Sequence, residues 1–126
     1  MESYLIKINC RCAFKLIDES NKNINVLSFK DVTQIDFEKL KFLESQIVIC
    51  IEVNNYNHLQ GIIKSKAIDN LNVPTIFILA QQDEKMIKML YSVHQINICF
   101  RYQPEILLTE QINYMFENYN LSLIHI

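Results

Sequence analysis

Short apolar runs alternate with polar stretches along the chain. The runs are rich in Ile, Val and Phe and are four to eight residues long, which predicts β-strands. They read YLIKI (4–8), INVLSF (24–29), IVICIEV (47–53), PTIFILA (74–80) and INICF (96–100). The polar stretches between and after them carry apolar residues at helical spacing. The pattern therefore predicts five strands alternating with five helices.

Each expected helix has a set of apolar residues on one face. The sets are Phe14, Leu16 and Ile17; Phe37, Leu40 and Leu43; Leu59, Ile62 and Ile63; Ile87, Leu90 and Tyr91; and Leu108, Ile112, Met115 and Phe116. The first set is the weakest. The last helix should start near Pro104, because proline is favoured in the first turn.

Alternating strands and helices predict one α/β domain with a doubly wound parallel sheet that helices cover on both faces. Such a sheet explains why the middle strands are apolar throughout and do not alternate with polar residues. Sites in these folds lie at the carboxyl ends of the strands, near the point where the strand order reverses. Function should therefore be sought in the residues that follow each apolar run.

Composition and charge narrow the function classes. Apolar residues make up 50% of the chain and the formal net charge is −2, so the chain has no general attraction to nucleic acid or to an anionic membrane. No apolar stretch approaches the roughly 20 residues that span a bilayer, and no leader pattern opens the chain. We expect a cytoplasmic protein that contacts neither membrane nor nucleic acid. Cys50 and Cys99 lie within apolar runs and should be buried thiols.

The residues that follow the expected strands do not match the pattern of a nucleotide, flavin or zinc site. Nucleotide and flavin sites need glycines for close backbone approach, and the one glycine, Gly61, falls within an expected helix. Cys10, Cys12 and His58 could approach each other, but a Cys-x-Cys pair with one distant His falls short of a zinc site. We expect no metal and no cofactor. An alternative is a small phosphocarrier or enzyme that uses Cys10, although the loop that follows is a poor set of backbone donors.

The stretch NVPTIFILAQQDEKMIKMLYSVHQINICFRYQPEILLTEQINYMFEN, residues 72–118, resembles the second half of a response-regulator receiver domain of two-component signalling. The first half fits in order and length, and the resemblance covers residues 3–119. It implies a flavodoxin-like, five-stranded sheet in the order 2-1-3-4-5.

The resemblance also implies where the phosphorylation residues of a receiver should lie. A typical receiver has an acid pair that holds Mg²⁺, a phosphate-accepting aspartate, a hydroxyl residue and a lysine. These positions fall on Asn9 and Cys10, on Ile51 with Glu52 next to it, on Leu79 and on Arg101. Neutral groups at the acid pair cannot neutralise Mg²⁺, which demands carboxylate oxygens. The chain therefore resembles a pseudo-receiver without phosphoryl-transfer activity, and we expect no enzyme.

Two alignments of the third strand stay open. In the first, Ile51 occupies the acceptor position and Glu52 begins the following loop. In the second, the strand is shifted by one residue, and Glu52 occupies the acceptor position. Glu52 would then pair with Arg101 as a fixed mimic of the phosphorylated state. In neither alignment do we expect Glu52 to be phosphorylated.

The resemblance implies signalling through the face made by the fourth helix, the fifth strand and the fifth helix. Aromatic, Met and Arg residues are enriched in interface cores. This face should contain Met86, Met89, Tyr91, Arg101, Tyr102, Tyr114 and Met115. The expected function is phosphorylation-independent binding of a protein partner, or homodimerisation, in signal transduction or transcriptional regulation.

The end of the chain sets the expected domain boundary. Residues 121–126, LSLIHI, resemble the translated start of a sequencing-library adapter and follow a helix that we expect to end at Tyr119. We expect a receiver-like domain over residues 1–120 and a tail over 121–126. If the tail is not native, the natural chain continues and an output domain can follow.

Overall fold

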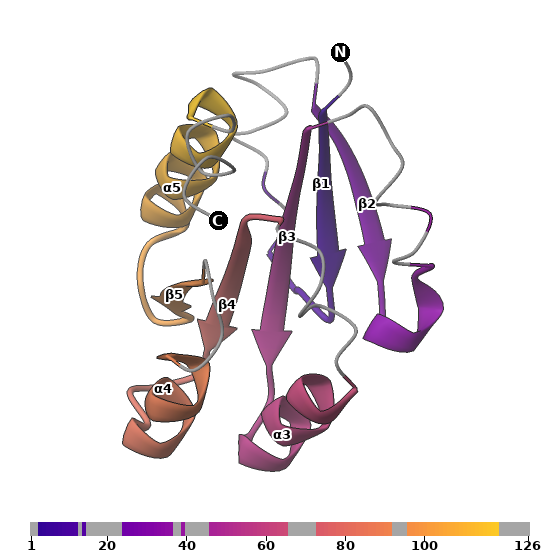
Figure 1. Ribbon diagram of the computed structural model, residues 1–126. Coiled ribbons are helices and arrows are strands. Elements are labelled where there is room, and N and C mark those ends of the chain that lie inside the picture. The colour runs from indigo at the N-terminus through magenta and orange to yellow at the C-terminus, as the bar shows by residue number, and fades with distance from the viewer. Residues whose placement is uncertain are drawn as a thin grey trace.

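Five parallel strands form one sheet in the computed structural model, which describes residues 3–12, 14, 24–36, 39, 46–65, 73–91 and 96–118. The strands are β1 (Ser3–Ile8), β2 (Ile24–Phe29), β3 (Gln46–Val53), β4 (Thr75–Leu79) and β5 (Ile96–Phe100). Their order across the sheet is β2-β1-β3-β4-β5 (Figure 1). The expected doubly wound, flavodoxin-like α/β arrangement is confirmed, and each strand lies within one residue of its predicted bounds.

Three of the five expected helices lie in the described part of the chain. They are α3 (Tyr56–Lys64), α4 (Glu84–Tyr91) and α5 (Glu105–Glu117), and a short 3₁₀ helix, η1 (Val32–Gln34), follows β2. The helices expected around Leu16 and Leu40 fall outside the described residues, as does the tail 121–126. None of the described helices is long and apolar enough to cross a membrane.

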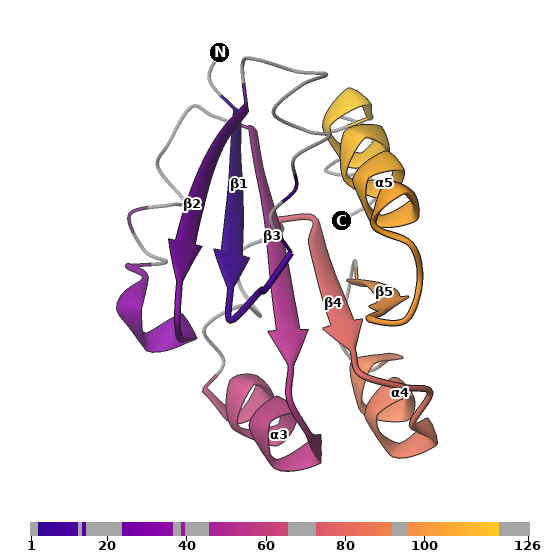
Figure 2. The same ribbon diagram turned by 180° about the vertical axis from the view of Figure 1, so that it is seen from behind.

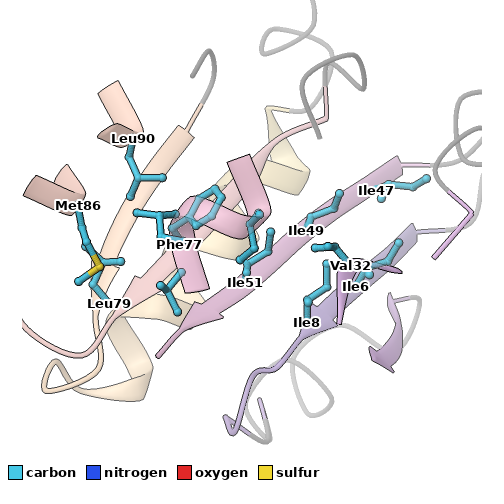
Figure 3. Close-up of a cluster of buried hydrophobic side chains, with 13 residues drawn as sticks. Ile6, Ile8, Val32, Ile47, Ile49, Ile51, Phe77, Leu79, Met86 and Leu90 are labelled. Carbon is cyan, nitrogen blue, oxygen red and sulfur yellow. The ribbon is translucent and has the colours of Figure 1, made fainter. Parts of the chain in front are cut away.

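The sheet has a separate apolar core on each face. Leu59 and Ile62 of α3 pack on the same face as Met86 and Leu90 of α4, and Figure 3 shows the two α4 side chains pointing toward β4. On the opposite face, α5 supplies Ile112, Met115 and Phe116. Figures 1 and 2 both show α5 separated from α3 and α4. The described helices therefore cover both faces, as a parallel sheet requires.

The alternation within β3 assigns each of its residues to one of these cores. Ile47, Ile49, Ile51 and Val53 belong to the core beneath α3 and α4, whereas Val48 and Cys50 belong to the core beneath α5. Successive side chains of a strand point to opposite faces, so Glu52 points to the α5 face. Because all residues of β3 from Ile47 to Val53 are buried, this carboxylate enters the interior of the protein.

The carboxyl ends of the strands meet at one edge, and the strand order reverses there between β1 and β3. Backbone pairing extends one residue past two of the strands. The Asn9 amide donates to the Phe29 carbonyl (2.9 Å), and the Arg101 amide donates to the Leu79 carbonyl (2.7 Å). Asn9 is thereby held at the edge beside the end of β2, and Arg101 beside the end of β4.

Candidate functional site

Glu52 is the centre of the site at the carboxyl edge of the sheet. Its side chain is 3% exposed, and Oε2 lies 2.7 Å from Nη2 of Arg101 and 3.7 Å from Nε of Arg11. Oε1 accepts a hydrogen bond from the Arg11 amide (3.1 Å). The expectation that Glu52 begins the loop is wrong, because Glu52 is the penultimate residue of β3. The ion pair with Arg101 that the second alignment predicts is present.

Arg101 reaches the carboxylate from the end of β5, across β4. Glu52 pairs in register with Ile78, and Ile78 pairs with Cys99, so these three residues form a row across the sheet. Arg101 follows Cys99 by two residues and lies on the same face. Although Nη2 is 2.7 Å from Oε2, the angles of this contact are not those of a hydrogen bond. The contact is therefore an ion pair, in which the attraction of the two charges does not require an aligned N–H group.

Asn9 fixes the loop after β1 against the end of β3. Its Nδ2 donates to the Glu52 carbonyl (2.9 Å) and to Oδ1 of Asn54 (3.0 Å). Its backbone has φ 53°, in the left-handed region that asparagine tolerates better than most residues. Both donors of the amide are therefore used within the protein, and the backbone turns sharply directly after β1.

Cys10 contacts another thiol. Its Sγ lies 3.9 Å from Sγ of Cys50 in β3, and both cysteines are free thiols. The hydrogen bond with Cys50 lowers the pKa of Cys10, against the opposing effect of burial. The same hydrogen bond, together with burial, raises the pKa of Cys50. Cys10 is therefore the more acidic thiol of the pair.

Two of the predicted site residues lie on the face of the sheet opposite Glu52. Ile51 and Leu79 are fully buried in the core beneath α3 and α4, on the face opposite Glu52. Figure 3 shows both side chains within this apolar cluster. Of the six predicted positions, the structure brings together Asn9, Cys10, Glu52 and Arg101, and it excludes Ile51 and Leu79 because their side chains point to the other face.

The predicted interaction face divides into exposed and buried residues. Tyr91 is 78% exposed, Tyr102 64% and Tyr114 65%. Met86 and Met115 are buried, one in each core, so assigning them to an exposed face was wrong. Met89 is partly buried against the core beneath α3 and α4. Exposed Ile106 and Leu107 extend the apolar surface at the start of α5.

His58 has a structural role at the start of α3. Its Nδ1 accepts a hydrogen bond from the Asn54 amide (3.0 Å), and its own amide donates to Oδ1 of Asn55 (2.9 Å). Asn55 is thus the N-cap of the helix. Within the described ranges, no three His, Cys, Asp or Glu side chains form a group that could hold a metal ion.

Several residues near the site were assigned no role from the sequence. Asn54 and the Arg11 amide bind Asn9 and Glu52, and neither has a sequence signal beyond its place after a strand. Lys7 is a buried cation in β1, and its Nζ lies 5.5 Å from the ring centre of Phe14. Because lysine is rarely buried, its presence within an apolar strand could have marked Lys7 in the sequence.

An open groove lies beside the site, between the ends of β1 and β2. It has a volume of about 750 Å³ and is lined by Asn9, Cys10, Arg11, Ser28, Phe29, Lys30 and Gln34. The groove gives solvent access to the loop that carries Cys10.

Comparison with known proteins returns no match to this chain among protein-family models, curated proteins or solved structures.

Proposed function

We propose that this chain is a receiver-like interaction domain that works without phosphorylation, in cytoplasmic signal transduction or transcriptional regulation. The observation that carries the proposal is the ion pair between Glu52 and Arg101 at the carboxyl edge of a sheet with the order 2-1-3-4-5. In this proposal the carboxylate replaces the phosphoryl group that a receiver acquires and loses, so the signalling conformation is permanent.

The burial of Glu52 supports a permanent contact. A carboxylate that is 3% exposed needs a positive partner, because an uncompensated buried charge is costly. Arg101 supplies that charge from β5, while the Arg11 amide supplies a hydrogen bond from the loop after β1. The pair therefore ties the end of β5 to the end of β3 without any added group.

The neighbours of Glu52 support the loss of phosphoryl transfer. Asn9 and Cys10 occupy the positions of the acid pair, and their polar atoms bind Glu52, Asn54 and Cys50. Phosphoryl transfer needs a metal or several cations to neutralise the charge that develops on the moving group. Neutral side chains that are already engaged within the protein are unsuited to that task.

The residue after Arg101 links the ion pair to the proposed interface. Tyr102 is exposed, and its ring stacks on Phe100 with centroids 5.5 Å apart and planes 11° apart. Because Arg101 is held by Glu52, Tyr102 is held at the surface in the turn between β5 and α5. Tyrosine rings that are already ordered contribute contact area at a low entropy cost.

The charges on α4 and α5 favour a second copy of the chain as the occupant of this face. Exposed lysines on α4 and exposed glutamates on α5 would meet in a two-fold pairing that places α4 of one copy against α5 of the other. They are Lys85 and Lys88 on α4, and Glu105, Glu110 and Glu117 on α5; Glu84, which is also exposed on α4, leaves that helix with one net positive charge. A different protein partner is the other occupant that the test must distinguish.

The test compares variants of the exposed tyrosines by sedimentation and by pull-down from the host. Tyr91→Asp or Tyr102→Asp should abolish association and leave the fold intact, because both side chains are exposed in the single chain. Leu27→Asp is the matched control: Leu27 is also an exposed apolar residue (41%), but it lies on β2 at the opposite end of the sheet.

Loss of self-association in the tyrosine variants alone supports a homodimer. If the wild-type protein sediments as a monomer and captures a protein from the host that Tyr102→Asp does not capture, the partner is a different protein. Unchanged behaviour of both tyrosine variants would overturn the proposal. The alternative that uses Cys10 as a phosphocarrier has no contact in its favour, since the described partner of that thiol is Cys50.

A further inference from the structure

Cys10 and Cys50 form a thiol pair that the proposed interface does not use. Cys50 lies within β3 and is fully buried, whereas Cys10 lies in the loop after β1, is half-buried and lines the open groove. Their sulfur atoms are 3.9 Å apart. One thiol is thus accessible from solvent, and the other lies directly behind it.

The separation of the sulfurs suits formation of a disulfide. A disulfide has an S–S length of about 2.05 Å, so the two sulfurs must approach by roughly 2 Å. Cys10 lies outside the strand ladder, two residues after the end of β1, and its neighbours Asn9 and Arg11 are hydrogen-bonded to Glu52, so the approach must strain those contacts. Cys50 stays fixed within β3, so Cys10 is the thiol that moves.

The two thiols also differ in reactivity. The thiolate is the nucleophilic form of cysteine. The pKa of Cys10 is lowered, first by the hydrogen bond with the Cys50 thiol, then by a backbone hydrogen bond at Cys12 and by the charge of Lys7. Burial and the charge of Glu52 act in the opposite direction. The same hydrogen bond and burial raise the pKa of Cys50 well above its usual value, so Cys10 is the thiol of the pair that is favoured as the nucleophile.

We propose that Cys10 is a site of oxidation by a peroxide and that Cys50 is its resolving thiol, so that oxidation joins the loop after β1 to β3 by a disulfide. In the first step the Cys10 thiolate attacks one oxygen of hydrogen peroxide. The S–O bond forms, the O–O bond breaks, and hydroxide leaves, which gives a sulfenic acid at Cys10. In the second step the Cys50 sulfur attacks the Cys10 sulfur. The S–S bond forms, the S–O bond breaks, and the hydroxyl group leaves as water with the Cys50 proton. The two sulfurs together lose two electrons, which reduce one peroxide to hydroxide and water; the hydroxide becomes the second water when it takes up the proton that the Cys10 thiol lost.

The position of the pair gives the oxidation a structural consequence. Cys10 lies between Asn9 and Arg11, which bind the backbone carbonyl and the carboxylate of Glu52. Cys50 precedes Glu52 by two residues on the same face of β3. A disulfide therefore pulls on the loop that holds Glu52.

Trypsin can assign the disulfide without ambiguity, because it places each cysteine in a separate peptide. Cys10 falls in peptide 8–11, Cys12 in 12–15, Cys50 in 42–64 and Cys99 in 89–101. The reduced full-length protein is exposed to a small excess of hydrogen peroxide, quenched with a thiol-blocking maleimide, and mapped by mass spectrometry without reduction. The expected product is peptide 8–11 joined to peptide 42–64, and dithiothreitol should separate them.

Single variants separate the two steps. Cys50→Ser should leave a Cys10 sulfenic acid that dimedone traps, and it should abolish the cross-linked peptide. Cys10→Ser should leave Cys50 reduced, because the buried thiol has no nucleophilic partner. Cys99→Ser is the matched control, since Cys99 is also a buried free thiol and should not change the wild-type product.

Three results would overturn the proposal, and the first two need only the wild-type protein. One is a cross-link from peptide 8–11 to peptide 12–15 or 89–101. Another is that all four thiols stay free after a dose of peroxide that oxidises glutathione in the same sample. The third is a sulfenic acid that forms equally on Cys10 and Cys99.

Discussion

Arg101 Nη2 lies 2.7 Å from Glu52 Oε2, although the two residues lie at the ends of β5 and β3 with β4 between them. The two partners differ in exposure, since the side chain of Glu52 is 3% exposed and that of Arg101 is 38% exposed. Removing one partner therefore has a different effect from removing the other. Without Arg101 a buried carboxylate is left behind, whereas without the charge of Glu52 the arginine can turn to solvent.

We predict that Arg101→Met destabilises the protein more than Glu52→Gln does. Arg101→Met should lower the free energy of unfolding by about 2 kcal/mol, because Glu52 stays buried with only the more distant Arg11 as a cation. Glu52→Gln should cost about 1 kcal/mol, because the amide oxygen can still accept from the Arg11 amide. Urea unfolding of both variants measures the difference.

The double variant completes this test. Glu52→Gln with Arg101→Met should be about as stable as Glu52→Gln alone, which corresponds to a coupling of about 2 kcal/mol between the two positions. Arg11→Met is the control, because that side chain is 78% exposed and should contribute less than about 0.5 kcal/mol. Near-zero coupling would show that Glu52 and Arg101 do not form a fixed pair in solution.

We predict that Asn9 stabilises the edge through both its side chain and its backbone. Asn9→Ala should cost about 2 kcal/mol, because it removes two hydrogen bonds and places alanine at φ 53°. Asn9→Gly should cost about 1 kcal/mol, because glycine adopts that φ without strain. Thermal unfolding of the two variants separates the contributions, and a glycine variant that is less stable than the alanine variant would contradict the left-handed backbone.

We predict that the chain gains no phosphate from acetyl phosphate with Mg²⁺ and binds Mg²⁺ only weakly. Glu52 is the one carboxylate among the site residues described above, and it is already paired with Arg101. A hard cation prefers several carboxylate oxygens. Intact-mass measurement tests the modification and calorimetric titration tests the metal. A mass increase of one phosphate that persists after removal of Cys10 would contradict this expectation.

We predict that iodoacetamide alkylates Cys10 before Cys12. Both cysteines are half-buried, but burial raises the pKa of Cys12 to about 11, and the carboxylate of Glu105 acts in the same direction. The pKa of Cys10 is lowered, first by its hydrogen bond with Cys50. Because only the thiolate reacts, Cys10 should be labelled at about pH 8, and Cys12 should react fast only as the pH nears its raised pKa.

Peptides 8–11 and 12–15 report the two labels separately by mass. Removing the hydrogen-bond partner with Cys50→Ala should slow the labelling of Cys10 at about pH 8, because the thiolate loses its main stabilising contact. Equal labelling of the two peptides across the pH range would show that the thiol contact is not maintained in solution.

The strands of this protein were predictable from its sequence, and the reason is physical. A parallel strand that is covered on both faces must be apolar at nearly every position, so β3 and β4 appear in the sequence as unbroken runs. The strand order came instead from the resemblance to receivers, and the structure confirms it. The sequence alone also shows that its one glycine, Gly61, lies too far from a strand end to form a phosphate-binding turn.

The side of each helix that faces the core needed the tertiary structure. Helical spacing shows which residues share a face, but it does not say whether that face meets the sheet or the solvent. Met86 and Tyr91 both belong to α4, yet Met86 is buried against β4 and Tyr91 is 78% exposed. The same limit applied to Met115 and Tyr114, which are neighbours on α5.

The site depended even more on tertiary structure. The sequence left Glu52 either in a loop or beside Arg101, because a shift of one residue moves a side chain to the other face of a strand. The row of Glu52, Ile78 and Cys99 across three strands decided the question, since it places Arg101 on the face of Glu52. The contact of Cys10 with Cys50 also required β1 to lie beside β3. The sequence determined which residues reach the edge of the sheet, and the strand order and register determined which of them meet.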